Sequence, residues 1–238
     1  MSSPETAVVL LHGLGRTRWA LARMERALRR AGYATLNRSY PSTRHPIDRL
    51  AREVVGARLA EAERAGARRV HFVTHSLGGI LVRYYAAHVG LPAGTRAVTV
   101  APPHGGSEVA DWLQGVQPFR WGYGPTLGEL GTGPTSVPLR LGPLHPHLEL
   151  GVIAGDSSAF PFLDGLTGEA TDGLVTLGRA RVEGMADFCV VPHGHTFIGS
   201  RPATIRQALH FLAHGRFSPS ARADVAGVEP RPAAVAGR

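Results

Sequence analysis

Several features are scarce or missing in this sequence of 238 residues, and each absence excludes a class of protein. Cys189 is the only cysteine, which excludes an internal disulfide framework and a cysteine-based zinc cluster. Because no run of about 18 apolar residues occurs, no membrane-spanning helix is expected. The first six residues are polar and lack the basic leader of a secretion signal. We therefore expect a cytoplasmic protein that is stabilised by one sizeable hydrophobic core.

Lysine is also absent, so all 26 basic residues are arginines, and they exceed the 18 acidic residues by a formal charge of +8. Such an excess can indicate a nucleic-acid or anionic-membrane partner. Here, however, the arginines are interleaved with apolar residues in helical segments, as in residues 18–30, which is typical of solvated helix faces. The pattern predicts no nucleic-acid partner. Peripheral docking on an anionic membrane is an alternative that it does not predict.

Short apolar runs alternate along the chain with longer segments of helical periodicity, each bounded by glycine or proline. This alternation predicts an α/β fold: a mostly parallel sheet of about six strands with helices on both faces. The expected strands are 6–11, 33–36, 69–74, 95–101, 148–154 and 187–191, and the expected helices are 18–30, 47–65, 77–89 and 203–213.

Two segments show neither periodicity. The first, 117–147, is rich in glycine, proline and aromatic residues, and we interpret it as a lid or a structured loop inserted into a domain of residues 1–214. Six aromatic residues in this segment or near it are candidates to line an apolar channel, although such residues more often pack in a core or loop: Trp112, Phe119, Trp121, Tyr123, Phe160 and Phe162. The second segment, 215–238, is predicted to be a disordered tail.

The motif with the clearest chemical meaning is Val73-Thr74-His75-Ser76-Leu77-Gly78-Gly79, located where an expected strand ends and an expected helix begins. A sharp turn at this place holds a serine hydroxyl clear of the sheet, and the small glycines allow the helix to pack closely against the strand. The N-terminus of the helix adds free N–H groups beside the hydroxyl. Ser76 is therefore a candidate nucleophile, and a serine that only caps the helix is the alternative.

With this motif the chain resembles the α/β-hydrolase fold, and within it the compact lipases and esterases. The resemblance is carried by His12-Gly13-Leu14-Gly15, by residues 74–79, by Asp172-Gly173-Leu174-Val175 and by His193-Gly194-His195-Thr196-Phe197, in the order serine, acid, histidine. It implies a serine nucleophile and an acyl-enzyme intermediate. Thr74 departs from the family pattern, in which a glycine usually occupies this place, so a larger side chain must fit beside the turn.

A serine hydroxyl needs a neighbouring imidazole to remove its proton. The resemblance places this base at His195, after the last expected strand and before the last expected helix, with His193 as the rival. His75 adjoins the serine, but an adjacent side chain on a tight turn points away from its neighbour. The pairs His145/His147 and His193/His195 would fit a metal site only with a third ligand, and we expect neither a metal nor a cofactor.

The acid that orients the histidine is expected after the next-to-last strand. Asp172 resembles the Asp-Gly-x-Val element that carries the acid in related lipases, and Asp156, directly after a strand, is the main alternative. Asp164 and Asp187 complete the set of candidates.

The resemblance also implies an oxyanion hole, formed by the backbone N–H groups of Leu14 and Leu77. Five further residues are candidates to border the substrate pocket: His12, Gly13, His75, Pro103 and His104. Together these residues predict a serine hydrolase that cleaves a small-molecule or lipid ester. Acyl transfer or amide cleavage by the same residues, and a binding module without catalysis, are the alternatives.

Overall fold

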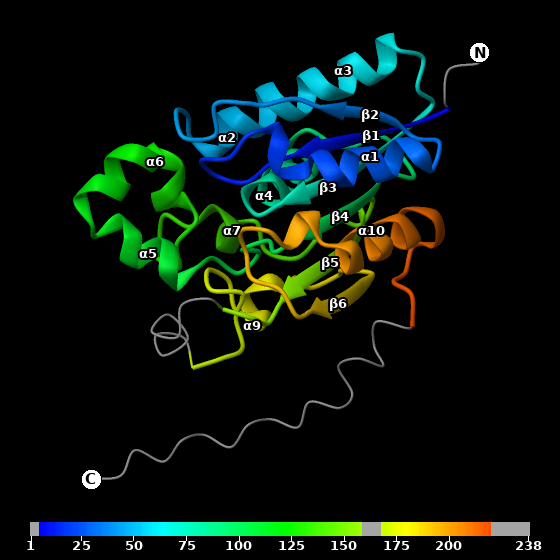
Figure 1. Ribbon diagram of the computed structural model, residues 1–238. Coiled ribbons are helices and arrows are strands. Elements are labelled where there is room, and N and C mark those ends of the chain that lie inside the picture. Colours follow the sequence, from blue (N-terminus) through cyan, green and yellow to red (C-terminus); the bar gives the residue numbers. More distant parts are fainter. Residues whose placement is uncertain (1–4, 159–167, 220–238) are drawn as a thin grey trace.

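The computed structural model describes residues 5–158 and 168–219, and six parallel strands form the sheet at its centre (Figure 1). Their order across the sheet is β2-β1-β3-β4-β5-β6. The strands are β1 (Thr6–Leu11), β2 (Ala34–Asn37), β3 (Arg69–His75), β4 (Arg96–Val100), β5 (Glu149–Gly155) and β6 (Asp187–Val191). The predicted α/β fold with a six-stranded parallel sheet is therefore confirmed.

Side chains that alternate along each strand supply two separate hydrophobic cores. In β1, Val9 and Leu11 belong to the core on one face, and Val8 and Leu10 belong to the core on the other. The first face is covered by α2 (Ile47–Leu50), α3 (Gly56–Arg64) and α4 (Leu77–His88), and the second by α1 (Ala22–Arg30) and α10 (Pro202–His214) (Figure 1). A π-helical turn, Ala51–Val55, joins α2 to α3, so the expected helix over 47–65 is nearly continuous.

Much of the segment 117–147, in which the sequence shows no helical periodicity, is helical. α5 (Glu108–Gln114) precedes α6 (Gln117–Glu129), the two helices contact each other, and α7 (Val137–Arg140) follows. α6 starts with a proline in its first turn and is kinked at Gly124, where φ is 61°, directly before Pro125. These residues interrupt the helical periodicity, which explains why the sequence pattern did not predict the helix.

The beginning of the expected tail also differs from the prediction. Phe217 is buried against Phe211 of α10, and its N–H donates a hydrogen bond to Asp187 Oδ2 at 2.8 Å. Ser218 N donates to the side chain of Gln207. The packed domain therefore extends beyond residue 214, because an aromatic residue there completes the core. Residues 220–238 of the predicted tail lie outside the described residues.

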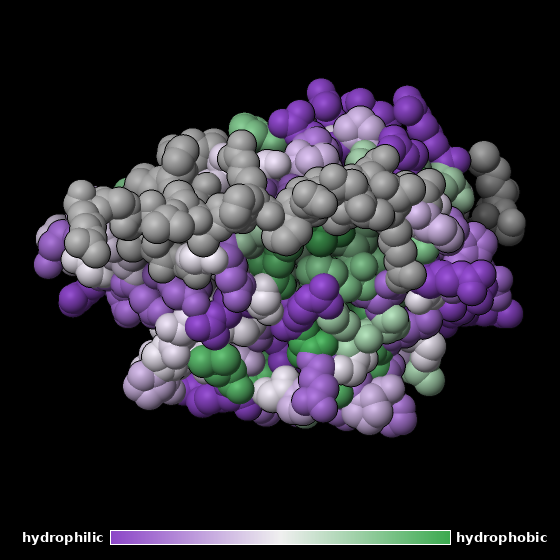
Figure 2. All heavy atoms as spheres, turned by 90° about the horizontal axis from the view of Figure 1, so that it is seen from below, coloured by the Kyte–Doolittle hydropathy of each residue, from purple (hydrophilic) through white to green (hydrophobic). Residues whose placement is uncertain are grey.

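On the face seen from below, hydrophobic side chains gather near the middle, and hydrophilic side chains are more frequent toward the edges (Figure 2). The short helix α9 (Leu177–Ala180) lies on this side of the molecule, beside β5 and β6 (Figure 1). In the ranges 5–158 and 168–219, no helix combines the length and apolar content needed to cross a bilayer.

The N-terminus of α4 lies very close to the sheet. A Cβ atom added to Gly78 would lie 2.6 Å from the carbonyl oxygen of Leu11 and 2.9 Å from its Cβ. The obstacle is partly backbone of the central strand β1, so it cannot move aside cheaply. Glycine at this position therefore allows α4 to begin directly beside the carboxyl end of β1.

We predict that Gly78→Ala destabilises the protein by about 1–3 kcal/mol, the usual cost of overpacking a close-packed core. Urea unfolding should show a lower midpoint with an unchanged m-value. Gly122→Ala is the matched control, because Gly122 lies in α6 and an added Cβ there meets no atom within 4 Å. Equal midpoints for the two variants would contradict the packing argument.

Candidate active site

Ser76 occupies a strained turn between β3 and α4. Its φ of 52° and ψ of −120° are unusual for a residue with a side chain, and among the described non-glycine residues only Ala101 shares a positive φ. The Ser76 N–H donates to the carbonyl oxygen of Val100 at 2.9 Å, which ties the turn to β4. The turn therefore presents the hydroxyl at the carboxyl edge of the sheet, where open α/β sheets bind their ligands.

Asp172 and His195 come from two loops that bind each other. His195 Nδ1 lies 2.8 Å from Asp172 Oδ2, and the His195 backbone N–H donates to the Asp172 carbonyl oxygen at 2.9 Å. The other carboxylate oxygen, Oδ1, accepts from the N–H groups of Leu174 and Val175 at 3.0 and 2.9 Å. Because an ionised carboxylate only accepts, Nδ1 carries the proton of a neutral His195, and Nε2 keeps its lone pair.

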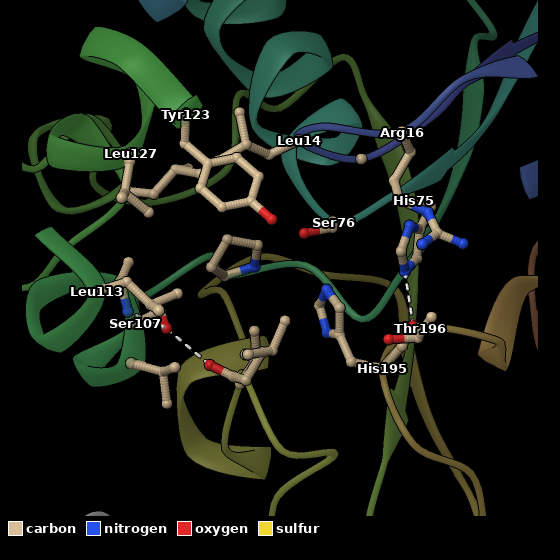
Figure 3. Close-up of a pocket in the computed structure, with 17 residues that line it drawn as sticks. Leu14, Arg16, His75, Ser76, Ser107, Leu113, Tyr123, Leu127, His195 and Thr196 are labelled. Atoms are coloured by element: carbon tan, nitrogen blue, oxygen red, sulfur yellow. Dashed lines mark hydrogen bonds between the residues drawn. The ribbon is translucent and has the colours of Figure 1, made fainter. Parts of the chain in front are cut away.

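Ser76 and His195 line the same pocket and both project into it (Figure 3). In the part of the chain that the structure describes, no hydrogen bond joins the Ser76 hydroxyl to the His195 ring. Catalytic hydrogen bonds are often long without substrate and tighten when the complex forms. The structure thus brings together the three side chains that the sequence singles out for nucleophile, base and acid.

His75 supports the loop that carries His195. Its Nε2 donates to the carbonyl oxygen of His195 at 2.9 Å, and the centroids of the two imidazole rings are 4.9 Å apart. Burial, together with the nearby His195, lowers the pKa of His75 to about 3. His75 is therefore neutral at physiological pH and keeps the N–H that holds His195 in place. It also lines the pocket, as expected.

The rival candidates for acid and base have other hydrogen-bond partners. Asp156 follows β5, and its Oδ1 accepts from the Ser157 hydroxyl at 3.3 Å. Asp187 is at the opposite, amino end of β6, where its carboxylate accepts from the N–H groups of Phe188 and Phe217. His193 makes a backbone hydrogen bond to Val191, and burial lowers its pKa. Asp164 lies outside the described residues.

The two expected oxyanion donors come from different parts of the chain, Leu77 from α4 and Leu14 from the loop after β1. Leu77 is the first residue of α4, so its N–H has no acceptor within the helix. Leu14 follows the carboxyl end of β1 and lines the pocket. Within residues 5–158 and 168–219, neither N–H donates a backbone hydrogen bond outside the regular elements. Both are thus free for an oxygen atom of a ligand.

His12 and His104 differ from expectation, because neither lines the pocket. His12 is fully buried and stacks on Tyr40, its Nε2 accepts from the Tyr40 N–H, and burial lowers its pKa. His104 is bonded to the buried Arg83 and to Thr99. His12 thus binds the backbone of Tyr40 and His104 binds side chains of α4 and β4, whereas Gly13 and Pro103 line the pocket.

The apolar part of the pocket comes from α5, α6 and the Asp172 loop, most of which the sequence analysis missed. Its side chains include Tyr123, Leu113 and Leu127 (Figure 3), and further lining residues are Val109, Ala110, Leu130, Leu174 and Val175. Of the expected channel aromatics that the structure describes, only Tyr123 lines the pocket. Trp112, Phe119 and Trp121 are 44%, 39% and 78% exposed. Phe160 and Phe162 lie outside the described residues. The spacing of Val109, Ala110 and Leu113 is helical and would have predicted α5.

The two histidine pairs that resemble metal ligands lack a third ligand. His145 and His147 have ring centroids 5.3 Å apart, and among the described residues no three His, Cys, Asp or Glu side chains form a group that could hold a metal ion. The backbone N–H of His193 donates to the Val191 carbonyl oxygen, whereas the ring of His195 is hydrogen-bonded to Asp172.

The low pKa of His75 predicts a pH-dependent loss of stability. Between about pH 6.5 and pH 3 the unfolded chain binds a proton that the folded protein excludes, so the free energy of unfolding falls as the pH falls. At pH 5 the loss amounts to about 2 kcal/mol. In urea titrations at pH 7.5 and pH 5, His75→Gln should show a correspondingly smaller drop than wild type. His147→Gln, at an exposed site, should match wild type. An unchanged pH dependence in His75→Gln would contradict the assignment.

Solved structures with a similar fold include several lipases. The mature form of the Bacillus licheniformis lipase BlEst2 superposes with a TM-score of 0.70 at 20% identity, covering 89% of this chain and 93% of that one. Phospholipase PlaB from Legionella pneumophila matches with a TM-score of 0.60 at 21% identity, covering 79% and 53%. The chain spans about half, 48%, of the propeptide form of BlEst2. At these identities the likeness shows the fold.

Sequence comparison gives the family. No curated protein was found to match the sequence. The profile described as "Alpha/beta hydrolase family" matches residues 8–234, which include most of β1, the other five strands and the Ser76, Asp172 and His195 loops. The chain belongs to the α/β-hydrolase family.

Proposed function

We propose that this protein hydrolyses carboxylic esters through an acyl-enzyme intermediate on Ser76. The observation that carries the proposal is the 2.8 Å contact between His195 Nδ1 and Asp172 Oδ2, in a pocket that Ser76 shares. This contact leaves the Nε2 lone pair of His195 free to accept a proton. Lipases and esterases among the structural neighbours support the same reaction class.

Acylation follows from these positions. Ser76 Oγ attacks the ester carbonyl carbon while its proton passes to His195 Nε2, and Asp172 stabilises the resulting imidazolium. The carbonyl oxygen becomes negatively charged next to the N–H groups of Leu14 and Leu77, each of which is worth about 3 kcal/mol in comparable sites. When the tetrahedral intermediate collapses, the bond to the alcohol oxygen breaks, and His195 Nε2 returns its proton to that oxygen.

Deacylation repeats the same steps with water. His195 Nε2 removes a proton from a water molecule, whose oxygen attacks the acyl carbon, and the proton then returns to Ser76 Oγ as the acid leaves. No step needs a redox partner or a cofactor. The residues that act are Ser76, His195, Asp172 and the two backbone donors.

The shape of the pocket supports an apolar acyl group. The pocket has a volume of about 800 Å³, including the open solvent at its mouth. Most of the side chains of α5 and α6 that line it are aliphatic. An acyl chain placed there would exchange water for leucine and valine side chains, at roughly 0.8 kcal/mol per buried methylene group. The side chain of Tyr123 borders this region (Figure 3).

We predict that a fluorophosphonate probe labels Ser76 alone, because the probe reacts with an activated serine whatever the natural substrate is. Mass spectrometry of the labelled protein locates the modified residue. Ser76→Ala should lose both labelling and ester turnover and unfold at nearly the wild-type temperature. Ser157→Ala, at an exposed serine near the same edge of the sheet, should label normally. Ester turnover by Ser76→Ala, or labelling of another serine, would refute the proposal.

We predict that Asp172→Asn lowers kcat by roughly 10³- to 10⁴-fold, because an amide no longer holds the productive tautomer of His195. The matched control is Asp156→Asn, which should retain wild-type turnover within a few-fold. Steady-state kinetics with a short-chain p-nitrophenyl ester measures both variants. If Asp156→Asn lost turnover and Asp172→Asn kept it, Asp156 would be the acid.

A further inference from the structure

Arg16 lies at the mouth of the pocket, in the loop after β1. Its backbone N–H donates to the carbonyl oxygen of Gly13 at 3.2 Å, and its side chain is half-buried. In Figure 3 the guanidinium lies on one side of Ser76, with His75 and Thr196, while Tyr123, Leu113 and Leu127 lie on the other. The apolar acyl region and the arginine thus flank the nucleophile from opposite directions.

Among the described residues, no Asp or Glu forms an ion pair with Arg16. In residues 5–158 and 168–219, no Asp or Glu lines the pocket. The carboxylate of Asp172, the candidate acid, already accepts hydrogen bonds from Leu174, Val175 and His195. Arg16 contributes to the lowered pKa of both His12 and His75. A half-buried cation without a counter-ion has its charge satisfied best by an anionic ligand.

A second hollow continues from the pocket past Arg16. Arg16 and Thr196 line both hollows, and the other lining residues of the second are Gly15, Thr17, Trp19, Ala20, Phe197 and Ser200. Trp19 and Phe197 are 70% and 60% exposed, which is unusual for aromatic residues. The Arg18 guanidinium lies over the Trp19 ring, 4.3 Å from its centroid. The second hollow therefore combines aromatic surface with positive charge, and it too contains no Asp or Glu.

We propose that Arg16 binds an anionic group, a carboxylate or a phosphate, on the alcohol portion of the ester. This inference rests on the proposed function, because the alcohol portion is defined by attack of Ser76 on the ester. If the acyl group lies against the side chains of α5 and α6, the alcohol oxygen lies on the other side of Ser76. Arg16 and the second hollow lie on that side. A guanidinium recognises either anion through two parallel N–H···O hydrogen bonds, and Trp19 and Phe197 contact the organic part beside it.

Four butyrate esters with the same aromatic framework test the proposal. The alcohol portions are 3-hydroxybenzamide (neutral), 3-hydroxybenzoate (carboxylate), 3-hydroxyphenyl phosphate and 3-hydroxyphenyltrimethylammonium (cationic), and hydrolysis is followed by chromatography. The measured quantity is kcat/KM of each charged ester divided by kcat/KM of the neutral one. The carboxylate and phosphate esters are separate arms, so the preferred anion is identified. Arg26→Gln, which removes an equal charge from the exposed face of α1, is the matched control.

Wild type and Arg26→Gln should prefer at least one anionic ester, and Arg16→Gln should lower that preference by about 10- to 100-fold, the usual effect of losing a charged hydrogen bond. Arg16→Lys should give an intermediate ratio, because lysine keeps the charge but loses the paired donors. Arg16→Glu should favour the cationic ester.

Two results would overturn the inference, and they are distinguishable. If wild type hydrolyses the neutral ester without an anionic preference, or if Arg16→Gln keeps the wild-type ratio, Arg16 does not bind the alcohol portion and the proposed function stands. If no ester is hydrolysed and the fluorophosphonate does not label Ser76, the proposed function fails, and this inference fails with it.

Discussion

The close approach of α4 to β1 is the constraint on which the rest of the site depends. Gly78 allows the first turn of α4 to lie against the Leu11 carbonyl oxygen, and this position forces Ser76 into a backbone conformation with a positive φ. Such strain persists only when the surroundings fix it. Here β3 pairs with β1 on one side and β4 on the other, and Val100 accepts the Ser76 N–H. The strand ladder therefore stabilises the turn that presents the hydroxyl.

Residues far apart in the sequence meet at Ser76 because all six strands are parallel and end at one edge. The Asp172 loop and the His195 loop then fix each other: one backbone bond and one side-chain bond join Asp172 to His195, and His75 holds the His195 carbonyl oxygen. Three attachments leave little freedom for the imidazole. Geometry prepared before substrate arrives lowers the entropic cost of reaching the transition state.

The sequence predicted most of the fold because buried strands and amphipathic helices have clear periods, and it singled out Ser76, Asp172 and His195 as candidates because their motifs adjoin strand ends. The sequence pattern did not predict features that depend on a break in periodicity or on contacts with residues far away in the sequence. α6 was missed because Gly124 and Pro125 interrupt its period. His12 and His104 were placed at the pocket because a sequence does not distinguish a histidine buried behind a loop from one that lines a cavity. No sequence motif includes Arg16, and its proposed role in substrate binding comes only from its position in the pocket of Ser76.

The neutrality of His75 matters for the proposed mechanism as well as for folding. In the acylation step His195 becomes an imidazolium, and the His75 ring lies only 4.9 Å from it between centroids. A charged His75 would oppose that proton transfer, since like charges at this distance repel strongly where water is excluded. Burial keeps His75 uncharged, so it acts only as a hydrogen-bond donor to the backbone of His195. Among the described residues that line the pocket, Arg16 then carries a permanent positive charge, on the side of Ser76 away from Tyr123, Leu113 and Leu127 (Figure 3).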